Sequence, residues 1–268
     1  MIHPSFKLIL FQGLLLVALF FASWGIVSQV HWMQVLHIQE LSEKSEKKLS
    51  ELILSSIERQ GEEVTDINAR GALDSIITGI CTANKLDRNK ITYHLLYNKE
   101  VNAFALPAGH LVIYTGLIDA VKQEEELDGV IGHELAHIQL SHVMKKLIKE
   151  VGISVLATIA GSKGTEAITK AGKILSATAF DRVLEKDADL TAIKYLTNAN
   201  VDPRPFGNFL DRLAKLASGK ASYPTWINTH PDSRDRAVYL RERSKHLRIN
   251  HRKLLSKQTW GRLKSIKP

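Results

Sequence analysis

The chain has 268 residues, 44% of them hydrophobic and 24% charged, and a formal net charge of +8. This composition is typical of a globular protein, and no low-complexity tract or internal repeat indicates a disordered or repetitive chain. A single cysteine, Cys81, excludes an intramolecular disulfide and a cysteine-based zinc site.

The first 37 residues are dominated by an apolar segment. Residues 8–30 contain no Asp, Glu, Lys or Arg and are long enough to cross a bilayer, and Trp24 and Trp32 suit its interfaces. A cleaved secretory signal is the alternative, but the apolar core of a signal is usually shorter and only Ser23-Trp24-Gly25 offers a cleavage site. We therefore expect an uncleaved membrane anchor.

Residues 38–114 predict two helices followed by a small sheet. The first helix leads from residue 38 toward Gly61 and carries an apolar stripe, and the second covers about residues 64–83. Runs rich in β-branched and aromatic residues at 91–97, 103–106 and 110–114 are separated by turn residues. We expect these runs to form a small antiparallel sheet.

The next segment carries the pattern H-E-x-x-H, as His133, Glu134 and His137, within a helix that begins near Asp119. Apolar residues at helical spacing give this helix a buried side. Residues four apart leave a helix on one face, so the two imidazoles have the separation that two ligands of one zinc need. Glu134 can take a proton from a water at the open position and later deliver it to a leaving amine.

A catalytic zinc takes three ligands from the protein, and the third candidate lies further along the chain. Val143 stands where an extended motif would place a third histidine. Glu185 and Asp189 are four apart on a predicted helix that ends near Asn198, so one can bind zinc while the other accepts the free N–H of a ligand histidine. Asp187 points away from this pair and is expected to face solvent.

The remaining segments predict loops and helices. Residues 151–161 are apolar but only half as long as a bilayer crossing requires, and 161–172 are expected to form a loop or frayed helix over the cleft. A helix over 205–216, a polar loop over 217–228 and a last helix from Asp232 follow.

The positive charge is concentrated at the C-terminus. Residues 241–268 hold ten Lys and Arg and one acid, while the other 240 residues are close to neutral. A solvated terminal helix is one interpretation and contact with anionic lipid is another. A nucleic-acid partner is not expected, because Trp260 is the only aromatic residue among these charges that could stack on a base.

The order of four motifs resembles the HtpX-like and CAAX-prenyl-protease-like family of zinc metallopeptidases. H-E-x-x-H is followed by E-x-x-x-D at 185–189. Asn102 to His110 is similar to a strand segment beside the family's active site, with Ala108 where the family usually has glycine, and Thr229-His230-Pro231 followed by Arg236 is similar to its T-H-P-x(4)-R element. The resemblance covers roughly residues 60–245.

Together, the residues and the resemblance predict an α+β, mainly helical, gluzincin-like fold with a small sheet at the active-site rim. We expect an anchor or signal at 1–37, a metallopeptidase domain at 38–245 and a basic tail at 246–268. The predicted function is a zinc endopeptidase that cleaves extended or misfolded polypeptides. The resemblance implies a role in envelope protein quality control. A single N-terminal anchor of a bacterial protein normally leaves the catalytic part outside the cytoplasm, so we expect a location in the inner membrane with the catalytic part facing the periplasm. If the segment is cleaved, the protein is expected to be free in the periplasm.

The predicted site has one zinc per chain. Its metal ligands are His133, His137 and Glu185, its catalytic residues are Glu134, His230 and Asp189, and its substrate-binding strand is Asn102, Ala103, Phe104, Ala105 and Leu106. His230 could occupy the open position of the metal, which would make the resting enzyme latent, or donate to the oxyanion. The competing function is a latent, chaperone-like binder of unfolded chains.

Overall fold

A computed structural model describes residues 38–57, 62–151, 174–175, 179–218, 225–247 and 252–267, together with positions 12, 13, 15 and 17. The chain divides into two units, residues 1–44 and 45–268, and the elements discussed below belong to the second, apart from residues 38–44 at the start of the first helix. Among the described residues, no helix combines the length and apolar character that a bilayer crossing requires. Most of the predicted anchor and the predicted loop at 161–172 lie outside the described residues.

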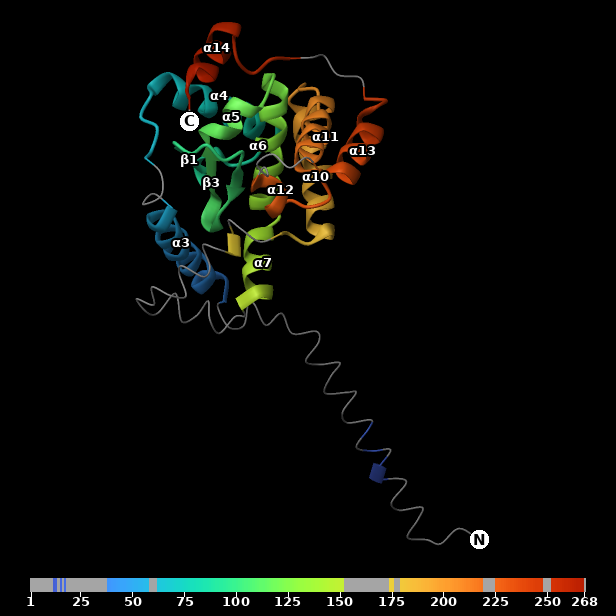
Figure 1. Ribbon diagram of the computed structural model, residues 1–268. Helices are drawn as coiled ribbons and strands as arrows, with labels where there is room; N and C mark the ends of the chain where they lie inside the picture. The colour runs from blue at the N-terminus through green and yellow to red at the C-terminus, as the bar shows by residue number, and fades with distance from the viewer. Residues whose placement is uncertain are drawn as a thin grey trace. The chain divides into compact units, whose positions relative to one another are not determined.

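A three-stranded sheet stands at the centre of the second unit (Figure 1), in the order β1 (Thr92–Leu96), β3 (His110–Tyr114), β2 (Ala103–Ala105). β2 is antiparallel to β3, but β1 is parallel to it. The predicted antiparallel sheet is therefore wrong for one of its two pairings. The chain between β1 and β2 does not fold back as a hairpin, and the position beside β1 is taken by β3 instead.

Helices surround this sheet, and most of them begin and end close to the predicted positions. They are α3 (Ile38–Ile57), α4 (Ile67–Asn84), α5 (Thr115–Ala120), α6 (Glu124–Gln139), α7 (His142–Val151), α10 (Arg182–Asn198), α11 (Arg204–Ser218), α12 (Thr225–Thr229), α13 (Ser233–Ser244) and α14 (Lys257–Ser265). The sequence did not predict α7 or α12, and a terminal helix such as α14 was one of two interpretations of the basic C-terminal residues. Asp119 lies in α5, and Gln123 is the residue that precedes α6.

The two faces of the sheet are buried in different clusters. Leu95, Leu111 and Ile113 pack with residues of α4, α6 and α10. Their neighbours Leu96 and Val112 point to the other face and pack with apolar residues of α3 and α7. This alternation follows from the two-residue period of a strand, and it explains why β3 reads as an almost continuous apolar run.

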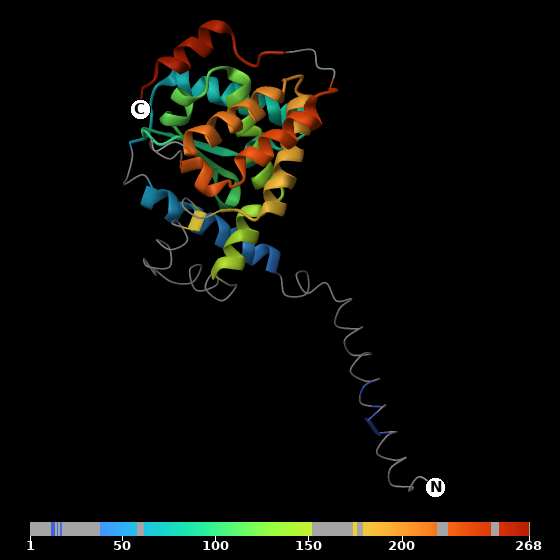
Figure 2. The ribbon, with the colours of Figure 1, turned by 45° about the vertical axis from the view of Figure 1, so that its right-hand side comes forward.

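The helix that carries the motif, α6, lies between the sheet and the pair α10 and α11 (Figures 1 and 2). A close approach to α11 depends on Gly129, because a Cβ atom there would lie 2.3 Å from Phe206 Cβ. Residues 124–137 are buried on this helix, except for Glu125, which is partly buried. Its central position keeps the motif away from water.

The turn between β2 and β3 carries the residue that departs from the family pattern. Ala108 has φ 56° and ψ 29°, and the next residue, Gly109, has φ 79°. The left-handed region is readily adopted by glycine but costs other residues about 1–2 kcal/mol. The turn is therefore formed with alanine at a conformation that favours glycine.

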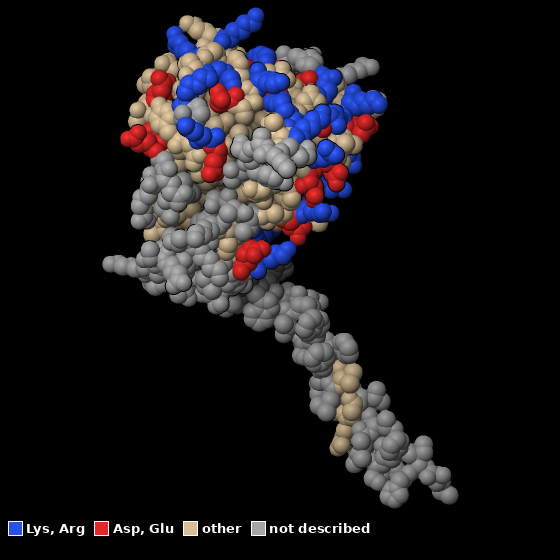
Figure 3. All heavy atoms as spheres, in the orientation of Figure 1, with Lys and Arg blue, Asp and Glu red and all other residues tan. Residues whose placement is uncertain are grey.

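The basic C-terminal residues pack on other parts of the second unit. Glu124 Oε1 accepts hydrogen bonds from the backbone N–H groups of Leu254 and Leu255, at 2.6 and 2.7 Å. Lys264 Nζ donates to three carbonyl oxygens at the end of α5, and Leu263 is fully buried. In Figure 3, Lys and Arg side chains gather over α11, α13 and α14. Contact of these residues with anionic lipid stays a prediction.

Candidate metal centre

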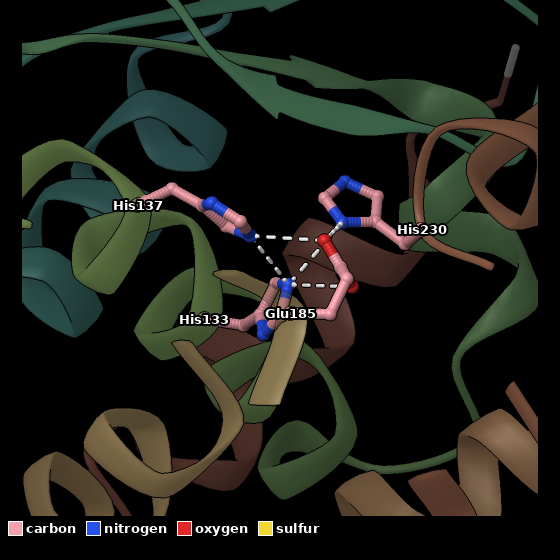
Figure 4. Close-up of side chains that lie close together, drawn as sticks. All are labelled: His133, His137, Glu185 and His230. Atoms are coloured by element: carbon pink, nitrogen blue, oxygen red, sulfur yellow. Dashed lines mark hydrogen bonds and ion pairs between the residues drawn. The ribbon is translucent and has the colours of Figure 1, made fainter. Parts of the chain in front are cut away.

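Four buried side chains from three parts of the chain converge on one point (Figure 4). His133 and His137 project from successive turns of α6, Glu185 comes from the first turn of α10, and His230 directly follows α12. One ligand atom from each lies within 4.8 Å of the others, and none of the four residues is more than 1% exposed. Asp181 caps the start of α10 by accepting the N–H of Val183, which places Glu185 in its first turn.

The spacing of these atoms fits a tetrahedral metal site. His133 Nε2 lies 3.0 Å from His137 Nε2 and 3.2 Å from His230 Nδ1. Glu185 Oε1 lies 2.9 Å from His230 Nδ1 and 3.3 Å from His137 Nε2. Zinc bonds of about 2.0–2.1 Å in a tetrahedron place neighbouring ligand atoms about 3.3–3.4 Å apart. The four atoms therefore need only small movements to surround such an ion.

The protonation of the cluster also suits a metal. Burial lowers the pKa of His137 well below its ordinary value, so its imidazole is neutral, as a ligand must be. Burial alone would raise the pKa of Glu185, but the Arg236 guanidinium and adjacent imidazoles hold it well below the usual range. The buried carboxylates of this cluster, on Glu134, Glu185 and Asp189, outnumber the buried cations beside them. The cluster therefore has an excess of negative charge, which a divalent ion would offset.

Outer contacts hold the ligands in place. Asp189 Oδ1 lies 3.0 Å from His133 Nδ1, the arrangement predicted for it. Arg236 donates from Nε and Nη2 to the two oxygens of Asp189, at 2.8 and 2.7 Å, and its Nη1 forms an ion pair with Glu185. Asp187, as predicted, is exposed. One guanidinium thus connects the carboxylate ligand to the carboxylate that orients a histidine ligand.

Comparison with known proteins agrees with this geometry. The sequence matches the model of peptidase family M48 over residues 68–244. This chain belongs to peptidase family M48. The resemblance to HtpX-like and CAAX-prenyl-protease-like metallopeptidases is confirmed, and the chain is an M48 metallopeptidase with a complete metal-binding group.

Several known proteins are similar to part of this chain. Metalloprotease LoiP of Escherichia coli (strain K12) is 29% identical over 167 residues, which cover 60% of this chain and 65% of LoiP. The bovine mitochondrial metalloendopeptidase OMA1 is 28% identical over 162 residues, or 55% of this chain and 31% of OMA1. The β-barrel assembly-enhancing protease of E. coli (strain K12) is 27% identical over 169 residues, or 58% and 35%. The match therefore spans less than two thirds of each relative.

The M48 motif glutamate, Glu134, lies between the ligand cluster and the edge of the sheet. Its Oε2 accepts the backbone N–H of Ala105 at 3.0 Å, and its Oε1 accepts Trp226 Nε1–H at 3.4 Å. His230 Nε2 lies 3.3 Å from the same Oε1. These contacts hold the carboxylate beside the metal ligands without making it one of them.

His230 is held between two aromatic rings. Trp226 stacks on it with ring centroids 4.4 Å apart, and Phe180 with centroids 5.5 Å apart. Its Nδ1 faces Glu185 and His133 while its Nε2 faces Glu134. The structure therefore places His230 among the candidate ligands, and its role in the enzyme stays a prediction.

The predicted substrate strand lies beside the metal centre. Ala103–Ala105 form β2 at the edge of the sheet, next to α6, and Asn102 and Leu106 flank it. All five residues are buried, and Asn102 Oδ1 has no hydrogen-bond partner among the described residues. Substrate binding by this strand stays a prediction.

Sequence reasoning missed four residues that contact the site: His142, Phe180, Trp226 and Arg236. His142 Nδ1 lies 3.2 Å from His137 Nδ1, and burial lowers its pKa to about 4. Two signals were available: His142 is a further histidine five residues after the motif, and Trp226 stands four residues before His230. Arg236 was recognised only as part of the element that resembles T-H-P-x(4)-R, and its contacts with Asp189 and Glu185 were not predicted.

Proposed function

We propose that this M48 protein is a zinc endopeptidase that cleaves extended or misfolded polypeptides. The observation that carries the proposal is the position of Glu134, whose carboxylate stands between the four-residue metal cluster and the backbone of the edge strand β2. A general base in this position reaches both a water at the metal and a peptide lying along β2. Two histidines with a carboxylate are the ligands typical of a catalytic zinc in peptidases.

The chemistry follows from the contacts of the residues. When bound, zinc supplies Lewis-acid stabilisation of the charge that develops on the scissile carbonyl. Glu134 takes a proton from the attacking water and passes it to the nitrogen of the leaving amine, so the acid and amine products form with no proton lost. Ala105 N–H and Trp226 Nε1–H hold the Glu134 carboxylate in place for both transfers.

The hydrogen bonds of β2 support peptide binding along its edge. The carbonyl of Asn102 accepts from Tyr114 N–H and the N–H of Leu106 donates to His110, so even-numbered residues pair with β3. The backbone N–H and carbonyl of Ala103 and the carbonyl of Ala105 then point to the edge away from β3, because successive residues alternate along a strand. The N–H of Ala105 is already bonded to Glu134. A substrate added here as a strand would be bound through its backbone, which tolerates many sequences.

A second candidate function, a latent protein that binds unfolded chains and cleaves few of them, is favoured by His230. A catalytic zinc needs a position open for water, and a cluster of three imidazoles and one carboxylate would fill a tetrahedron. We propose that His230 keeps the resting site closed.

The names of the assembly-enhancing relatives support a role in envelope protein quality control.

One experiment separates the two candidate functions. Glu134→Gln keeps the size of the side chain but removes its basicity, so we expect the variant to bind one zinc per chain and to lose casein cleavage. Wild-type cleavage should stop when a chelator removes the metal and return when zinc is added. If Glu134→Gln suppresses client aggregation while the wild type barely cleaves casein, the binder is the better description. Near-wild-type turnover in Glu134→Gln would reject the assignment of the base.

The location of the protein is a separate proposal. We infer that residues 8–30, which have no charged side chain, anchor the chain in a bacterial inner membrane with the catalytic unit in the periplasm. The protein should then stay in the membrane fraction after a carbonate wash. Recovery in the soluble fraction with a mature N-terminus near Ile26 would show that the segment is a cleaved signal.

A further inference from the structure

The two histidines of the motif have different outer partners. His133 Nδ1 faces the carboxylate of Asp189, which is itself held by Arg236. His137 Nδ1 faces another imidazole nitrogen, Nδ1 of His142, at 3.2 Å. A ligand histidine usually donates its free N–H to a carboxylate, a backbone carbonyl or water. A neutral imidazole in that place is therefore a distinctive feature of this site.

The directions of the rings determine which atom carries each proton. His137 points its Nε2 at His133 and Glu185 within the ligand cluster, so a metal there leaves the ring proton on Nδ1. That N–H can be accepted only by an unprotonated nitrogen. His142 must then carry its own proton on Nε2 and accept through Nδ1.

The fold brings His142 to this position through a short, strained connection. Only Leu140 and Ser141 separate the end of α6 from His142, the first residue of α7. Ser141 has φ 54°, a left-handed conformation that non-glycine residues rarely adopt. The turn places the His142 ring, 1% exposed, against His137 with centroids 5.1 Å apart. Backbone strain of this kind is commonly kept where it positions a functional group.

We propose that His142 is a positioning residue of the metal centre, which fixes the tautomer and orientation of His137 by accepting its Nδ1–H. The inference rests on the proposed metal site, because the proton assignment follows from a metal at Nε2 of His137. Val143 and Leu147, buried in the cluster that also contains α3 and one face of the sheet, keep α7 and the His142 ring in place.

A purely structural role for His142 makes a different prediction from a hydrogen-bond role. The oxygen of an asparagine side chain is as many bonds from the backbone as histidine Nδ1, whereas glutamine reaches the position of Nε2. Glutamine is closer to histidine in volume, so packing alone favours His142→Gln over His142→Asn. Acceptance through Nδ1 favours His142→Asn, because only asparagine can place an acceptor beside His137.

The test compares the zinc dissociation constants of the full-length wild type and three variants, measured by competition with a chromophoric chelator. We expect His142→Ala and His142→Gln to weaken zinc binding about 10- to 100-fold, the usual effect of losing an outer partner. His142→Asn should stay close to the wild type. Equal affinity in the wild type and His142→Ala, or a glutamine variant that binds as well as the asparagine variant, would overturn the proposal.

A measurement on the wild type keeps the proposal testable if the variants do not fold. Nitrogen NMR of the zinc-loaded protein, with labelled histidine, should report the proton of His142 on Nε2 and that of His137 on Nδ1. A proton on Nδ1 of His142 would contradict the inference. A wild type that binds no zinc would instead reject the metal site, so the two failures are distinguishable.

Discussion

Replacing Arg236 by methionine should destabilise the metal-free protein more than any change at an exposed arginine. Its guanidinium is 7% exposed and contacts two carboxylates, Asp189 and Glu185, that are almost completely buried. Arg236→Met keeps much of the side chain's length but leaves both carboxylates without their cation. Burial would then act against ionised groups that the guanidinium had compensated.

The expected magnitude follows from the burial of this group. Removing one partner of a buried ion pair costs about 3–5 kcal/mol, because it leaves an uncompensated charge. Asp189→Asn, which breaks hydrogen bonds to a charged group, should cost about 1–3 kcal/mol. The double variant removes one of the stranded charges, so its loss should be about 1–3 kcal/mol smaller than the sum of the two single losses.

Chemical denaturation of the chelator-treated proteins measures these free energies of unfolding. Calorimetry should show Arg236→Met melting lower by about 2–4 °C for each kcal/mol lost. Arg241→Met is the matched control, since Arg241 lies on the same helix with its side chain 42% exposed and only a 3.9 Å contact to Asp211. It should change stability by less than about 1 kcal/mol. Losses at Arg236 and Asp189 that add within about 0.5 kcal/mol would refute the shared ion-pair network.

Three further predictions concern the metal, the resting state and pH. Glu185→Ala should lose zinc far more severely than Asp187→Ala, measured by elemental analysis and chelator competition, and equal affinities would place the third ligand elsewhere. His230→Ala, assayed at matched zinc content, should raise peptidase activity if His230 blocks the site, and should lower it roughly a hundred-fold if it donates to the oxyanion; unchanged activity would reject both roles. Burial, with help from two nearby glutamates, raises the pKa of Asp128 well above its usual value. As the pH rises above about 4, the unfolded chain loses this proton before the folded protein does, so the wild type becomes less stable. Asp128→Asn has no such proton, and its stability relative to the wild type should therefore increase from pH 4 to pH 8. A stability difference that does not change with pH would contradict this prediction.

The sequence by itself was enough to predict the contacts that depend on one helix. His133 and His137 share a face because residues four apart always do so in an α-helix, and Glu185 and Asp189 follow the same rule on α10. The boundaries of the long helices were close for a similar reason, since apolar periodicity is a local feature of the sequence.

Contacts between distant segments were decided only by the tertiary structure. The parallel pairing of β1 with β3 was not predicted, because the residues of each strand show which positions are buried but not which neighbouring strand it pairs with. The basic C-terminal segment suggested a solvated helix, yet Glu124 and the carbonyls at the end of α5 supply partners for it. The outer partners of the metal ligands, His142 and Arg236, depend on a strained two-residue turn and on the packing of α13 against α10. The sequence does not show which group a charged side chain or an imidazole will contact, since hydrogen bonds of this kind form only when packing brings the two groups within reach.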